Sequence, residues 1–245
     1  MYFFGAYFTF HKELNDFLSK YQKDKTIFYK FNGKPSVKDS IEAIGIPHTE
    51  VEHIIVNGIS VEFSCHIKNR DEINVYPLCS DIKCTNLIKL REEIGDAGFI
   101  LDVNLGKLAR LLRMCGFDAL YNNSYDDHQI AQLAADSGRI VLTRDRRLLK
   151  FKDITYGYWL RSDDPHRQIK EVLKRYGLYG SINEFKRCIR CNGFIQRVDK
   201  NAIIDILEPL TEKYYNEFYR CDTCEQIYWK GSHYYKMKDY LDALM

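Results

Sequence analysis

The stretch FILDVNLGKLARLLR, residues 99–113, decides the fold class of the larger part of the chain. Phe99, Ile100 and Leu101 form a short apolar run typical of a buried strand, and the apolar residues that follow recur with a helical period, with Asn104 as the expected cap. The pattern then continues with an extended segment at 118–121, helix 127–136, strand 139–143, a short helix 146–151, strand 154–160 and helix 165–176. This alternation predicts a parallel sheet covered by helices on both faces.

Aspartates follow the strands of this α/β segment. Asp102 comes directly after the first strand, Asp145 after residues 139–143 and Asp163 after residues 154–160, while Asp127 begins a helix. Ligands of open parallel sheets bind at the carboxyl ends of the strands. Carboxylates that converge there favour a hard cation such as Mg²⁺ or Mn²⁺, which can promote in-line displacement at a phosphodiester.

Helix capping is the competing interpretation of these acids, because Asp is a preferred N-cap residue. Asp164 immediately precedes Pro165 at a helix start, and Asp126 lies three residues before Gln129 in a capping-box pattern. Asp145 could cap the helix at 146–151. Asp102 fits capping least well, since Asn104 is the better cap for the helix that follows. Spacing alone leaves both interpretations open.

Residues 1–80 have a different order of elements, β-β-α-β-β-β. The expected strands are 2–10, 26–31, 51–56, 59–67 and 73–76, and Ser36 is expected to cap a helix at 37–44 that ends at Gly45. This order predicts a small α+β roll. Residues 81–96 are predicted to be a linker, with 89–96 as a candidate helix, between this module and the α/β domain at 97–180.

Four of the eight cysteines form two CxxC pairs in the last segment, residues 181–245. Cys188 and Cys191 are separated by 29 residues from Cys221 and Cys224. Four thiolates can bind Zn²⁺ tetrahedrally in a closed, structural site. The gap exceeds the usual spacing, so a hairpin or a helix is expected between the two pairs. Thiol-rich metal sites without a secretory signal favour a reducing compartment, and we expect the cytoplasm.

The composition is that of an ordinary soluble globular protein, with 45% hydrophobic and 29% charged residues. No apolar stretch is long enough for a membrane span. The net charge of +2 is unevenly distributed: residues 99–180 contain 14 Lys/Arg and 10 Asp/Glu, giving +4, against −2 for residues 1–98. A basic segment that also contains aspartates is compatible with a phosphate-bearing substrate bound with metal ions.

The quoted run 99–113, together with Asp126-Asp127-x-x-Ile130, VLTRDRRLL at 141–149 and RSDDP at 161–165, resembles the PIN-like ribonuclease family named for the C-terminal domain of the Mut-seven exonuclease. The resemblance extends through both CxxC pairs to YWKGSH at 228–233. It implies a PIN-type α/β domain with an appended zinc ribbon, and metal-dependent cleavage of RNA. By position, Asp102, Asp127 and Asp145 match the family's metal-binding acids, and Asp163 is the candidate for a fourth. The acid on the helix is commonly Glu in this family and is Asp127 here.

Basic side chains near these acids are candidates for RNA contacts. On the first helix they are Lys107, Arg110 and Arg113, and beside Asp145 they are Arg144, Arg146 and Arg147. Such residues anchor backbone phosphates without reading a sequence. In the ribbon, Arg187, Arg190, Tyr228, Trp229 and Lys230 suit RNA as well, although Trp229 is expected to pack in the ribbon core.

The first module resembles the ubiquitin-like β-grasp domain often fused before this nuclease, through residues 36–51, Val56-Asn57-Gly58 and residues 71–77. It is more distantly similar to sulfur carriers that act through a C-terminal Gly-Gly. Here Pro77 is followed by Leu-Cys-Ser-Asp, which argues against sulfur transfer. The resemblance leaves a docking role toward a protein partner or RNA.

The sequence thus predicts a ribonuclease with structural Zn²⁺ and catalytic Mg²⁺ or Mn²⁺ that hydrolyses RNA. The resemblance to PIN domains favours cleavage within the strand. The alternative is a non-catalytic zinc-ribbon RNA-binding or adaptor protein whose aspartates cap helices. The sequence names neither the RNA, nor the partner of the first module, nor the oligomeric state.

Overall fold

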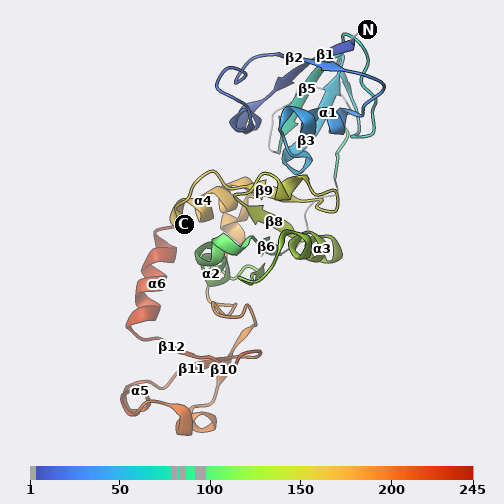
Figure 1. The fold of residues 1–245 in the computed structure, drawn as a ribbon. Helices are drawn as coiled ribbons and strands as arrows, with labels where there is room; N and C mark the ends of the chain where they lie inside the picture. The colour runs from blue at the N-terminus through green and yellow to red at the C-terminus, as the bar shows by residue number, and fades with distance from the viewer. Residues whose placement is uncertain (1–3, 79–81, 83–85, 92–97, 245) are drawn as a thin grey trace. The chain divides into compact units, whose positions relative to one another are not determined.

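The computed structural model describes residues 4–78, 82, 86–91 and 98–244. Two compact units divide the chain, one comprising Met1–Ala97 and Asp126–Trp159, the other Gly98–Tyr125 and Leu160–Met245. The chain therefore passes from the first unit to the second and back before it ends in the second (Figure 1). Within the described ranges, none of the helices has the length and apolar character that a membrane crossing requires.

The first unit begins with a five-stranded sheet and one helix. The strands are β1 (Phe4–Phe10), β2 (Ile27–Phe31), β3 (Val51–Val56), β4 (Ile59–Ser60) and β5 (Glu72–Pro77), and the helix is α1 (Val37–Ile44). The strand order is β2-β1-β5-β3-β4, with β1 and β5 parallel and the other neighbours antiparallel. Phe8, Ile41 and Ile54 are fully buried between sheet and helix. The predicted α+β roll is confirmed.

Helix α1 begins as the sequence predicts. The Ser36 hydroxyl accepts from the Asp39 amide at 3.1 Å, and the Asp39 carboxylate accepts in return from Ser36. Its first amides find further acceptors in residues 61–67, where Val37 N donates to Cys65 O at 2.7 Å and Lys38 N to Phe63 O at 3.3 Å. The predicted strand 59–67 is wrong for this reason: it ends at Ser60, and its remainder satisfies amides that a helix start leaves unpaired.

The described part of the predicted linker contacts the roll. Ile88 N donates to Ser60 Oγ at 3.0 Å, and Ile88 O lies 3.0 Å from His53 Nδ1. Residues 89–91 are not helical. The rest of the candidate helix at 89–96 lies outside the described residues.

The second part of the first unit contains two parallel strands and a helix. They are α3 (Asp127–Ser137), β8 (Ile140–Thr143) and β9 (Gly157–Trp159), with a 3₁₀ turn, η4 (Leu148–Lys150), between the strands. The Asp126–Gln129 capping box is present, and Gly138 ends α3 in the left-handed conformation. The predicted helix 146–151 contracts to η4, and the predicted strand 154–160 begins three residues late. The Ile154 carbonyl instead accepts a hydrogen bond from His48 of the roll, and the Thr155 carbonyl accepts one from Arg91 of the linker.

The second unit holds β6 (Phe99–Leu101) and β7 (Ala119–Leu120), which pair in parallel, and the helices α2 (Gly106–Met114) and α4 (Pro165–Arg175). The predicted strand 99–101 is confirmed. The predicted cap at Asn104 is wrong, because Asn104 lies inside the 3₁₀ turn η3 (Val103–Leu105), and α2 begins after it. The Leu105 amide bonds Asp102 O at 2.9 Å, so the chain turns immediately after the strand.

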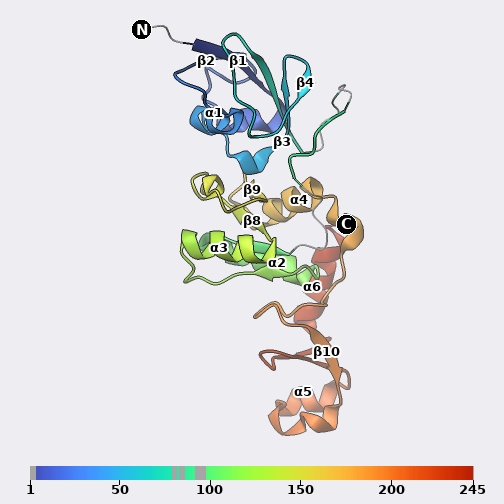
Figure 2. The same cartoon turned by 90° about the vertical axis from the view of Figure 1, so that its right-hand side faces the viewer.

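The rest of the second unit is a three-stranded antiparallel sheet with helices at both ends. Its strands, in the order β10-β11-β12, are β10 (Ile195–Val198), β11 (Phe218–Cys221) and β12 (Ile227–Trp229). Between β10 and β11 the chain forms 3₁₀ turns and α5 (Pro209–Tyr214), which fill the long gap between the cysteine pairs. Helix α6 (Ser232–Asp242) follows β12 and lies on the other side of the sheet from α5 (Figure 2).

Candidate functional site

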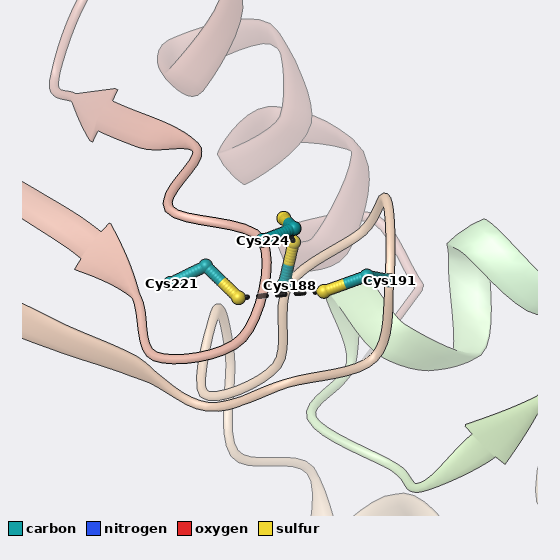
Figure 3. A group of neighbouring side chains, drawn as sticks. All are labelled: Cys188, Cys191, Cys221 and Cys224. Atoms are coloured by element: carbon teal, nitrogen blue, oxygen red, sulfur yellow. Dashed lines mark hydrogen bonds between the residues drawn. The ribbon is translucent and has the colours of Figure 1, made fainter.

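The four cysteines converge from two turns of the ribbon (Figure 3). Their sulfur atoms all lie within 4.8 Å of one another. Among the described residues, these four cysteines form the one group of three or more His, Cys, Asp or Glu side chains that is close enough to share a metal ion. Cys188 Sγ is 3.6 Å from Cys224 Sγ, and Cys191 Sγ is 3.4 Å from Cys221 Sγ. A tetrahedral Zn²⁺ with bonds of about 2.3 Å separates its sulfurs by about 3.8 Å. The cluster can therefore hold zinc, and these distances exclude disulfides.

Local geometry shifts the pKa values of these thiols in different directions. Burial alone would raise the pKa of Cys188, but the Tyr228 hydroxyl, 3.0 Å from its sulfur, and the amides of Arg190 and Cys191 lower that pKa to about 7. Burial raises the pKa of Cys191 to about 12, since its neighbouring thiols compete for the same charge. Gly193 permits the turn: a Cβ there would lie 2.8 Å from Cys221 Sγ.

The first cysteine turn is fastened to the end of α2 and to β7. Arg113 is almost completely buried and donates to Ala119 O at 2.9 Å and to Arg190 O at 2.9 Å. Asn192 accepts from Ala119 N at 3.0 Å and donates to Asp118 Oδ1 at 2.7 Å. Arg113 is a predicted candidate for phosphate contacts, but its guanidinium is buried and donates to backbone carbonyls inside the unit.

Asp145 lies in the turn that follows β8. Its amide bonds Thr143 Oγ1 at 2.8 Å, and its carboxylate accepts from the Arg147 amide at 2.8 Å and from Arg147 NH2 at 3.2 Å. Burial would raise the pKa of Asp145, but these bonds and the charge of Arg147 lower it. Asp145 is thus an anion at neutral pH, held in a tight Asx-type turn rather than capping a long helix.

Arg146, beside it, has a different environment. Its guanidinium donates to Phe17 O at 3.2 Å and to Asp16 O at 3.1 Å, and it lies 3.9 Å above the Trp159 ring centroid. Trp159 in turn donates through Nε1 to Arg144 O at 3.2 Å. The guanidinium thus ties the Asp145 turn to the N-terminal roll, which differs from the phosphate contact predicted for it.

The other predicted acids occupy the expected positions along the chain. Asp127, in the first unit with Asp145, is the exposed first residue of α3, and its charge acts on Arg147. Asp102 and Asp163 belong to the second unit. Asp102 follows β6, is buried, and its side chain does not cap η3; Asp163 is exposed before α4, whose N-cap is Asp164 as predicted.

The Asp163 segment is fixed by a residue that the sequence analysis did not single out. Both oxygens of Glu171, on α4, accept backbone amides: Arg161 N at 3.0 Å and Ser162 N at 3.0 Å. Gln168 adds a bond to Ser162 O at 2.9 Å. The only sign of this role in the sequence is a polar residue on the inner side of a helix. The backbone amides that it accepts cannot be identified from the sequence.

Three of the predicted basic contacts are on exposed positions. Lys107 and Arg110 are exposed on α2, and Arg144 is exposed immediately before Asp145. Exposed cations of this kind can approach a phosphate without losing internal hydrogen bonds. Arg147 is also exposed; it pairs with Asp145 at 3.2 Å, and the charge of Asp127 also raises its pKa.

The roll contacts the chain after β8 through a run of buried polar residues, the contact loop His48–Glu50. His48 lies 2.6 Å from Glu42 Oε1 and 2.9 Å from Ile154 O. Thr49 donates to Leu149 O at 3.4 Å, and Glu50 accepts from the Trp159 amide at 2.6 Å. The roll therefore holds both ends of the segment between Asp145 and β9. A single sequence gave no sign of this, because all but one of the partners are backbone groups.

Comparisons with known proteins were made for the whole chain. Residues 97–241, more than half of the chain, match the family model of the Mut7-C RNAse domain, and residues 4–83 match that of the Mut7-C ubiquitin domain. No curated protein and no solved structure matches the chain. The two family matches agree with the resemblance read from the sequence, and the chain belongs to the Mut7-C RNAse domain family, with a Mut7-C ubiquitin domain preceding the RNAse domain.

Proposed function

We propose that this protein is a metal-dependent ribonuclease with a PIN-like α/β nuclease domain, acting endonucleolytically on RNA. The observation that carries the proposal is the match of residues 97–241 to an RNAse domain model, a range that includes all four predicted acids. Their positions support it, because Asp102 and Asp145 each follow a strand that pairs in parallel.

The acids fit a hard divalent cation. Asp145 is held in its ionised form, as a metal ligand must be, and a set of carboxylate oxygens selects Mg²⁺ or Mn²⁺ over softer ions. We assign the ion to Asp102, Asp127 and Asp145, with Asp163 as a fourth ligand. When bound, such an ion lowers the pKa of water and stabilises the oxygens of an in-line displacement.

The side chains around these acids do the remaining work of substrate binding. Lys107, Arg110 and Arg144, which are exposed, are the proposed contacts to backbone phosphates of the RNA. Arg147 pairs with Asp145 at 3.2 Å, and its exposed side chain could move away at little cost if a cation took that position. Arg146 keeps the turn in position rather than contacting RNA.

The proposal also covers location and partners. The thiols of the cysteine cluster need a reducing compartment, and we place the protein in the cytoplasm. The surface of the ubiquitin-like module outside its contact loop is the proposed site for a protein partner.

Cleavage of a panel of fluorescent RNAs by zinc-loaded protein, with and without Mn²⁺, tests the proposal. Asp145→Asn is expected to lose at least a hundredfold in rate, since one ligand of the ion is weakened. Asp153→Asn is the matched control, because Asp153 is an exposed aspartate of the same unit. Equal rates for both variants, or no Mn²⁺-dependent cleavage, would contradict the nuclease. Zinc-dependent RNA binding without cleavage would instead support the non-catalytic adaptor.

A further inference from the structure

A pocket of about 250 Å³ lies in the second unit between the ribbon sheet and α6. It is formed by the first cysteine turn, the three strands and the first turns of the helix. Its lining residues are Glu184, Phe185, Arg187, Ile189, Ile195, Tyr219, Tyr228, Trp229, Lys230, Tyr234 and Met237. Pockets for drug-sized ligands measure about 300–1,000 Å³. The size thus fits one small planar group.

The walls of the pocket are mainly aromatic. Phe185 and Tyr234 pack together with ring centroids 4.8 Å apart, and Tyr219, Tyr228 and Trp229 come from the sheet. Trp229 remains 36% exposed, so the expectation that it packs into the ribbon core is only partly met. Gly231 allows the indole to lie close to the backbone, since a Cβ there would be 2.8 Å from Trp229 Nε1. Exposed aromatic faces around a slot favour a stacked ring.

Arg187 gives the pocket a donor that the fold does not use. Its NH1 donates to Asn192 O at 3.1 Å, its NH2 pairs with Asp118 at 3.5 Å, and its guanidinium stacks on Phe194 at 4.1 Å. Its Nε is buried and has no hydrogen-bond partner within the described part of the chain. A buried donor left unpaired costs about 1–3 kcal/mol. A ligand atom that accepts this hydrogen bond would recover that cost.

The charges around the pocket indicate what carries the ring. Lys186, Arg190 and Arg197 are exposed on the same ribbon, and Lys230 lines the pocket itself. Cations around an aromatic slot suit a base that is attached to phosphates, because the base stacks while the backbone follows the positive surface. Lys230 already pairs with Glu217 at 2.9 Å, but an uncharged metabolite would make no use of the charges of Lys186, Arg190 and Arg197.

From this arrangement we infer that the ribbon pocket binds one unstacked nucleobase of single-stranded RNA, with Arg187 as hydrogen-bond donor and Tyr234 and Trp229 as stacking partners. The inference rests on the proposed function and adds to it a base-binding subsite away from the acids. It gives the ribbon a role in holding substrate in addition to its metal.

The two tryptophans of the chain allow a direct test. In a Trp159→Phe background, Trp229 is the remaining tryptophan, and its fluorescence reports on the pocket. Zinc-loaded protein without Mg²⁺ or Mn²⁺ is titrated with a short single-stranded RNA and with the same strand carrying an abasic site at its centre. Binding of the intact strand is expected to quench Trp229, and the abasic strand is expected to bind more weakly.

Tyr234→Ala and Tyr235→Ala form the matched pair. Tyr234 lines the pocket, whereas its neighbour Tyr235 is 57% exposed and does not line it. Loss of one base–aromatic stack, worth about 1–3 kcal/mol, should weaken the intact strand roughly 5- to 150-fold in Tyr234→Ala. Tyr235→Ala should bind normally, and Tyr234→Phe should recover binding because it keeps the ring. Circular dichroism and zinc content verify that each variant is folded.

Equal affinities of Tyr234→Ala and Tyr235→Ala, or equal affinities for intact and abasic strands, would overturn the inference. Failure of the nuclease proposal looks different. In that case Asp145→Asn and Asp153→Asn behave alike with Mn²⁺, while the pocket still distinguishes intact from abasic RNA. Conversely, if cleavage depends on Asp145 and Tyr234→Ala has no effect on RNA binding, the proposed base-binding pocket is contradicted and the proposed nuclease activity is supported.

Discussion

Replacement of Arg146 by alanine tests whether the N-terminal roll stabilises the turn that carries Asp145. The guanidinium makes two hydrogen bonds to carbonyls, at 3.2 Å and 3.1 Å, and a cation–π contact at 3.9 Å from the Trp159 centroid. A partly exposed hydrogen bond of this kind contributes about 1 kcal/mol net, and the cation–π contact contributes about 0.5–1 kcal/mol. We therefore expect a loss of about 2–3 kcal/mol for the turn.

Amide hydrogen exchange of residues 143–151, with denaturant unfolding of the whole chain, measures this loss. Arg146→Lys should lie between wild type and Arg146→Ala, because an ammonium keeps the charge but not the paired donors. Arg144→Ala is the matched control: Arg144 is exposed, its hydrogen bond to Trp159 uses its backbone carbonyl, and its loss should change stability by less than about 0.5 kcal/mol. If Arg146→Ala exchanges as slowly as Arg144→Ala, the guanidinium does not secure the turn.

The same substitution has a consequence for metal binding if the proposed function holds. Asp145 would keep its carboxylate but lose a fixed position, so Mn²⁺ affinity should fall while the pH dependence of Asp145 stays set by Arg147. Isothermal titration of Mn²⁺ into zinc-loaded Arg146→Ala checks this. If the turn became mobile in Arg146→Ala and the Mn²⁺ affinity stayed unchanged, the roll would have no effect on metal binding.

Three further outcomes follow from other contacts. Glu42→Gln should lower the free energy of unfolding by about 1 kcal/mol at pH 7. Burial raises the pKa of Glu42, but the hydrogen bond and charge of His48 lower it overall. The difference between the two proteins should therefore persist above pH 4.5 and vanish below it, as acid protonates the wild-type carboxyl. Arg113→Lys should cost about 2–4 kcal/mol and speed zinc loss to a chelator, measured with a colorimetric zinc indicator, because buried carbonyls of the cysteine turn lose their donors. Zinc removal should unfold the ribbon, seen as rapid proteolysis within residues 187–229, and Mg²⁺ should not restore it.

Features encoded within a few residues could be predicted from the sequence. The capping boxes at Ser36 and Asp126, the cap at Asp164 and the strand 99–101 are local, and the structure has all of them. The convergence of the two CxxC pairs could be predicted as well. It joins distant segments, but the residue type and spacing leave few other ways to satisfy four thiols.

The predicted elements were wrong where a residue far away in the sequence forms a hydrogen bond with the backbone. The segment 61–67 has a strand composition, yet its carbonyls accept hydrogen bonds from the first amides of α1. The carbonyls of Ile154 and Thr155 likewise accept from His48 and Arg91 before β9 begins. Arg113 and Arg146 could not be distinguished from surface cations, because the sequence around an arginine that binds buried carbonyls does not differ from the sequence around one that faces solvent. Nothing in a single sequence marks a carbonyl more than seventy residues away as the acceptor.

These anchors also bear on what the ubiquitin-like module contributes to the protein. The contact loop and Arg91 bind the segment after Asp145 mainly through the backbone of that segment, as in the bond from Arg91 to Thr155 O at 3.1 Å. The Lys150 side chain adds a bond to Glu42 O of α1 at 2.9 Å. A module that served only as a tether would not need to satisfy buried backbone polar groups of the RNAse domain. Each such group left unpaired costs about 1–3 kcal/mol. A partner that bound the contact loop would have to displace it from residues 149–159 and would thereby loosen the turn at Asp145. By the same coupling, loosening of that turn would favour binding of the partner.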